Sequence, residues 1–88
     1  MYIAFVFSME DRVEAFVSPG ELTDVQRRHD DVTKKLKAQG RTTWSVILDL
    51  EDPTIVLRML SGSKLQTVQR AMASYIQLEH VRKMDAIS

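Results

Sequence analysis

Hydrophobic and polar positions along the chain change their period several times, and each change marks the boundary of an expected element. Residues 2–8 form a nearly unbroken apolar run, rich in β-branched and aromatic side chains, which predicts a strand covered on at least one face. Residues 12–17 alternate, with Val13, Ala15 and Val17 on one face. The short segment between the two runs predicts a hairpin.

A helix is predicted next, over residues 19–39. Ser18 occupies the expected N-cap position, Pro19 is the first helical residue, and Glu21 is placed to complete a capping box. Gly40 supplies the left-handed residue that ends the helix. An apolar stripe at helical spacing is expected to face the core, and it consists of Leu22, Val25, His29, Val32 and Leu36.

The second half of the chain predicts the same order of elements. Residues 42–50 and 54–60 alternate as strands on either side of a turn that contains Pro53. A second capping-box spacing, beginning at Ser63, predicts a helix that ends near Met84. The predicted fold class is α+β: a two-layer sandwich of ββαββα order, in which a four-stranded, mainly antiparallel sheet carries both helices on one face.

The two halves also share short sequence similarities. Met9-Glu10-Asp11 corresponds to Leu50-Glu51-Asp52, and Val25-Gln26-Arg27 corresponds to Val68-Gln69-Arg70. These matches raise the hypothesis of an internal repeat with pseudo-twofold symmetry.

Length and composition predict one domain over residues 1–88. The 88 residues are 44% hydrophobic and 27% charged, as in ordinary globular proteins rather than disordered or fibrous ones. Residues 78–88 are predicted to form a helix tail that extends from the core, because Glu79 and Lys83 continue the buried line of that helix. The chain has no cysteine, no signal peptide and no membrane-length apolar segment, which favours a cytoplasmic protein that does not contact a membrane.

No recognisable catalytic or metal-binding motif is present in the sequence. The two histidines, His29 and His80, are expected on different helices, without cysteines or paired carboxylates at ligand spacing. The serines lack a motif that would activate a nucleophile, and the segment 61–64 lacks the second glycine of a phosphate-binding loop. We therefore expect a non-enzymatic protein without a metal or cofactor. His29 is interpreted as a core histidine with one satisfied hydrogen bond, and an enzyme centred on it is the rival hypothesis.

Charge is balanced overall, with 12 basic and 12 acidic residues, but it is unevenly distributed. Residues 1–25 are mainly acidic and residues 26–41 are mainly basic. The basic cluster favours contact with nucleic acid or with an acidic partner, and Trp44 is available to stack on a base. A solvated helix face is the simpler interpretation of the same cluster. Its members are Arg27, Arg28, Lys34, Lys35, Lys37 and Arg41.

The predicted fold leaves more apolar side chains than one sheet face and two helices can bury. If both helices cover one face, the other face is a large apolar surface exposed to solvent. We therefore predict a protein interface, in a homodimer or in a complex with another protein. It is formed by Phe16, Ile47, Val56 and Leu60 of the sheet, or by Leu78, Val81 and Met84 of the helix tail.

The leading functional hypothesis is a small non-enzymatic binding protein that acts through protein–protein contacts. It would be a regulator, inhibitor or assembly subunit, of the compact kind that phages and plasmids encode. The alternative is a nucleic-acid-binding module that uses the basic residues of the segment 27–41.

Overall fold

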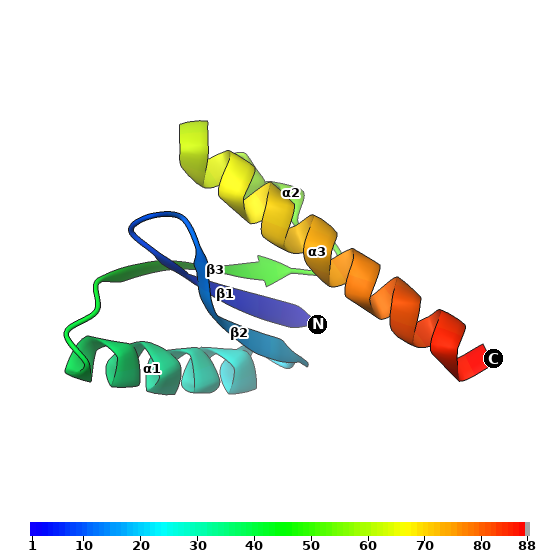
Figure 1. The fold of residues 1–88 in the computed structure, drawn as a ribbon, viewed down its shortest axis with the longest axis horizontal. Coiled ribbons are helices and arrows are strands. Elements are labelled where there is room, and N and C mark those ends of the chain that lie inside the picture. The colour runs from blue at the N-terminus through cyan, green and yellow to red at the C-terminus, as the bar shows by residue number, and fades with distance from the viewer. Residues whose placement is uncertain (88) are drawn as a thin grey trace.

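The computed structural model of the chain contains a three-stranded antiparallel sheet with helices on both faces (Figure 1). It describes the backbone of residues 1–87 and the side chains of residues 1–76. The strands, in the spatial order β2-β1-β3, are Tyr2–Ser8 (β1), Val13–Gly20 (β2) and Thr43–Asp49 (β3). The helices are Leu22–Ala38 (α1), Thr54–Leu57 (α2) and Gly62–Ile87 (α3). The predicted α+β class is confirmed.

The central strand β1 contributes side chains to two separate cores. Ile3, Phe5 and Phe7 pack in one core with residues of α2 and α3. Ala4 packs in a second core with α1. Because successive side chains of a strand point to opposite faces, a strand with helices on both sides must be apolar throughout. The unbroken apolar run of residues 2–8 is thereby explained.

The fourth predicted strand, residues 54–60, is instead the short helix α2 and the turn that follows it. Helical spacing places Val56, Leu57 and Leu60 on one side, because residues three and four apart share a helix face. All three pack against the core that α3 covers. The predicted four-stranded sheet, the ββαββα order and the internal repeat are therefore wrong.

The two long helices cover opposite faces of the sheet, and the prediction that both lie on one face is wrong. α1 buries Val25 against Ala4 and Val17, and α3 buries Val68 and Ala71 in the other core. Both β2 and β3 run antiparallel to β1, so they are parallel to each other, and α1 crosses one face to connect them. The other face is then covered by the remainder of the chain, with the last turns of α3 extending past the sheet (Figure 1).

α1 begins at Leu22 rather than at Pro19, because β2 continues through Ser18 and Pro19. The N-cap residue is Glu21, which makes no side-chain capping bond. Proline is tolerated here because β2 is an edge strand, whose outward amide positions need no partner in the sheet. Arg28 donates a hydrogen bond from Nη2 to the carbonyl oxygen of Ser18, at 3.1 Å, and so joins α1 to the end of β2.

The end of α1 agrees with the prediction. Gly40 has a φ of 78°, in the left-handed region that favours glycine. This conformation turns the chain so that the amide of Arg41 donates to the carbonyl oxygen of Leu36, at 3.1 Å. The carbonyl groups at the helix end are thus partly satisfied before β3 begins.

β2 is irregular at two points of its pairing with β1. Phe16 lies opposite Phe5 and Val13 lies opposite Phe7, but the register shifts between these pairs. The extra residue in β2 is a bulge, which reverses the simple alternation of side chains. Val13 and Phe16 therefore lie on the face that α3 covers, whereas Val13 was predicted to share a face with Val17.

Candidate functional site

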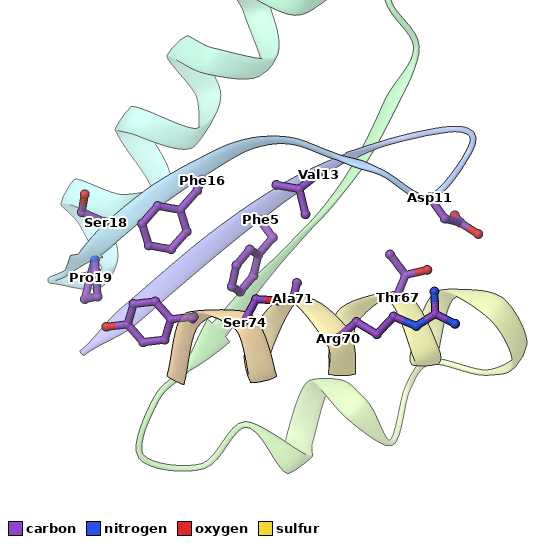
Figure 2. Close-up of a pocket in the computed structure, with 11 residues that line it drawn as sticks. Phe5, Asp11, Val13, Phe16, Ser18, Pro19, Thr67, Arg70, Ala71 and Ser74 are labelled. Atoms are coloured by element: carbon purple, nitrogen blue, oxygen red, sulfur yellow. The ribbon is translucent and has the colours of Figure 1, made fainter. Parts of the chain in front are cut away.

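A groove of about 390 Å³ lies between the edge strand β2 and helix α3 (Figure 2). Val13 and Phe16 of β2 line one side, Ala71 and Tyr75 of α3 line the other, and Phe5 of β1 lies between them. The bulge in β2 creates this arrangement, since it turns two apolar side chains of the edge strand toward α3. The middle of the groove is therefore apolar and largely aromatic.

The aromatic rings of the groove are in mutual contact. The ring centroid of Phe16 lies 5.6 Å from that of Phe5 and 5.7 Å from that of Tyr75. These distances are typical of favourable aromatic pairs, so the wall is preformed. Yet 44% of Phe16 and 54% of Val13 remain exposed. Apolar side chains held open in a concave site are typical of a binding surface.

Polar groups lie at the two ends of the groove. Asp11, Thr67 and Arg70 line one end, and Ser18 with Pro19 lines the other (Figure 2). The guanidinium of Arg70 has no ion pair with any side chain that the structure describes. An occupant with an apolar centre and a charged group beside it would match both parts of this lining.

The four sheet residues predicted as an interface do not form one surface. Phe16 lies in the groove, but Ile47 packs beneath α1 with the second core. Val56 of α2 and Leu60, after the turn that follows α2, are half-buried and pack against the core beneath α3. The open sheet face expected from a single helical layer does not exist, because α1 covers it. The other three predicted interface residues, Leu78, Val81 and Met84, lie outside the described side chains.

Five of the six residues of the basic cluster lie in two groups, and Lys35 belongs to neither. At the start of the helix, Arg27 and Arg28 lie 2.5 Å and 3.3 Å from the carboxylate oxygens of Asp24, so acidic charge neutralises them in part. Lys35 is exposed. At the far end, Lys34, Lys37 and Arg41 line a shallow hollow together with Asp30, Thr33, Thr42 and Thr43.

Trp44 does not lie on the side of these cations. Its ring stacks on Phe7, with 4.4 Å between centroids, and packs with the core beneath α3. The indole Nε1 donates to the carbonyl oxygen of Ser8 at 3.1 Å, and the ammonium of Lys64 lies 5.3 Å from the ring centroid. The basic cluster is on the opposite helix, so Trp44 is not positioned to stack on a base that those cations hold.

His29 forms a Ser–His–Asp arrangement that sequence reasoning missed. Its Nε2 lies 2.6 Å from Ser45 Oγ, and its Nδ1 lies 3.2 Å from Asp30 Oδ1. No motif links His29 to Ser45, and only the alternation of β3, which turns Ser45 toward α1, would have indicated the contact. The imidazole is 16% exposed, whereas Asp30 is 79% exposed.

The position of this arrangement favours a structural role. Neither His29 nor Ser45 lines the groove or the basic hollow. A substrate bound in either place would therefore not reach the Ser45 hydroxyl. The hydrogen bond between them instead links α1 to the sheet. This agrees with the interpretation of His29 as a core histidine with a satisfied hydrogen bond.

Comparison of the chain with protein-family models, with curated proteins and with solved structures finds no match. Among the residues that the structure describes, no three His, Cys, Asp or Glu residues gather as a metal site. Within the same part of the chain, no helix has the length and apolar character needed to cross a membrane. Function is therefore inferred from the geometry of this chain's own surfaces.

Proposed function

We propose that this protein is a small non-enzymatic binding domain that acts through protein–protein contacts, as a regulator, inhibitor or assembly subunit. Its docking site is the groove between β2 and α3. The observation that supports this proposal is the apolar lining of the groove, in which Phe16 and Val13 stay substantially exposed beside Tyr75. The cytoplasmic location stays a prediction.

The occupant of the groove is an apolar segment of a partner protein. A volume of about 390 Å³ accommodates an aromatic or branched aliphatic side chain with its neighbouring backbone. The bulges and Pro19 disrupt the outer edge of β2, so binding energy comes from buried side chains rather than from an added strand. An acidic residue next to the apolar anchor would pair with the guanidinium of Arg70.

Substitution of Phe16→Asp tests this proposal. Phe16 supplies the central wall of the groove, and a central aromatic anchor contributes about 2 kcal/mol or more to binding, or roughly a 30-fold change in affinity. A partner would first be identified by crosslinking in an extract of the native host. It would then be purified and titrated by calorimetry against the wild type and the variant.

Met59→Asp is the matched control, because Met59 is 80% exposed on the turn after α2 and does not line the groove. We expect Phe16→Asp to lose affinity and Met59→Asp to retain it, while circular dichroism shows both variants folded. A folded Phe16→Asp variant that binds the partner as tightly as the wild type would refute the docking site.

A nucleic-acid-binding module using residues 27–41 is the second candidate. It is favoured by the hollow in which Lys34, Lys37 and Arg41 gather at the end of α1. It is opposed by the carboxylate that neutralises the cations at the start of the helix. A gel-shift assay with DNA and RNA decides between the candidates, because binding through phosphate contacts weakens steeply as salt is added.

A further inference from the structure

The outer edge of β3 is regular. Its seven residues pair with β1 without a shift in register, from Thr43 opposite Ser8 to Asp49 opposite Tyr2. The strand contains no proline and no charged residue before Asp49. Edge strands in natural proteins usually carry a bulge, a proline or a charge that prevents further pairing, as β2 does. The carbonyl of Asp49 accepts a hydrogen bond from the amide of Asp52, at 3.2 Å. The outward backbone groups of Thr43, Ser45 and Ile47 have no hydrogen-bond partner among the described residues, so they can pair with another strand.

Charges of opposite sign lie at the two ends of β3. The basic hollow lies at its beginning, where Lys34, Lys37 and Arg41 outnumber one carboxylate, that of Asp30, in a lining that includes Thr42 and Thr43. Arg41 is paired with Glu14, at 2.6 Å, but the two lysines have no ion pair with a described side chain. The end of the strand carries carboxylates in succession, at Asp49, Glu51 and Asp52.

We propose that two copies of this chain associate through β3, paired antiparallel about a two-fold axis to form one continuous sheet. In such an arrangement the beginning of one strand lies against the end of the other. The basic end of each copy thus meets the acidic end of its partner, and symmetry produces this contact twice. The opposite charges lie at the two ends of the same strand. The partner that complements both ends is therefore a second copy of β3 rather than an unrelated strand.

The dimer leaves the groove free. β2 and β3 are the opposite edges of the sheet, so pairing through β3 does not cover Val13 or Phe16. Ile47 was predicted as an interface side chain, and it lies in β3 with its side chain beneath α1. In this dimer Ile47 pairs with the partner strand through its backbone rather than its side chain. A hydrophobic pattern describes side chains and does not indicate such backbone pairing.

Charge reversal at the two ends of β3 tests the dimer. Lys37→Glu and Glu51→Lys change exposed side chains, and neither side chain makes a hydrogen bond or ion pair with the described residues, so the monomer stays folded. Each reversal acts twice in a two-fold dimer, and we expect each to raise the dimer dissociation constant about tenfold. The double variant restores the attraction with the signs exchanged. Sedimentation velocity over a concentration series of the full chain measures these constants.

Lys35→Glu is the control, since it makes the same change of charge on the same helix outside the hollow. We expect it to leave the dissociation constant unchanged. Hydrogen exchange gives a second measurement: the outward amides of β3 become protected as the dimer forms, and those of β2 do not. Phe16→Asp leaves the dimer intact, which separates this test from that of the groove.

Several results would overturn the proposal. The wild type could remain a monomer at every concentration up to its solubility limit. Lys35→Glu could weaken the dimer as much as Lys37→Glu, or the double variant could fail to restore it. Amides of β3 that exchange equally fast in monomer and dimer would also overturn it.

Discussion

Val25→Ala tests whether α1 covers the second face of the sheet. Val25 is 0% exposed and packs against Ala4 and Val17. Losing two buried carbons costs about 1.6 kcal/mol by transfer, at about 0.8 kcal/mol each. The remaining cavity adds roughly 1 kcal/mol, and the better helix propensity of alanine offsets about 0.5 kcal/mol. The expected net loss in the free energy of unfolding is about 2 kcal/mol.

Urea denaturation followed by circular dichroism measures this loss, and a thermal scan should show the melting temperature lowered by about 8 to 16 °C. Val13→Ala is the control, because it removes the same atoms from a side chain that is 54% exposed. It should cost less than about 1 kcal/mol. If both substitutions destabilise the protein equally, Val25 is not buried against the sheet and the two-faced arrangement is incorrect.

Two further substitutions test local features. Gly40→Ala should lower the free energy of unfolding by about 1 kcal/mol in urea denaturation, because the residue has a φ of 78°. An added Cβ meets no atom within 4 Å, so the loss comes from the backbone conformation alone. An unchanged stability would contradict the left-handed turn. His29→Ala, Ser45→Ala and their combination form a double-mutant cycle, and we expect a coupling of about 1 kcal/mol from the hydrogen bond between them. Additive losses would mean that the bond does not stabilise the contact of α1 with β3.

The hydrophobic pattern predicted β1 and β3, but it assigned residues 54–60 to a strand. Ile55 and Val56 have a high intrinsic preference for strands. Over a segment of seven residues, the pattern of apolar and polar positions does not distinguish a strand from a short helix. The helix forms because, with the turn that follows it, it places Val56 and Leu60 together against the core. Propensity is a weak preference, and packing against α3 and the sheet outweighs it.

The candidate groove was predictable only in part. Phe16 was identified as an interface residue from its excess apolar surface, but Tyr75 and Arg70, which complete the groove, were not connected with it. The connection depends on the bulge of β2 between Val13 and Ala15, where no glycine or proline marks a bulge in the sequence. A single extra residue in a strand changes which face each later side chain occupies.

The amino-acid sequence by itself determined the α+β class, where β1 and β3 lie, and that Gly40 ends the first long helix. These features depend on local periodicity and on the conformations that single residues allow. Only the tertiary structure decided that the helices occupy opposite faces of the sheet, that β3 is an edge strand, and that His29 contacts Ser45. Those features depend on which segments pack together across the chain, and many packings satisfy the same local pattern.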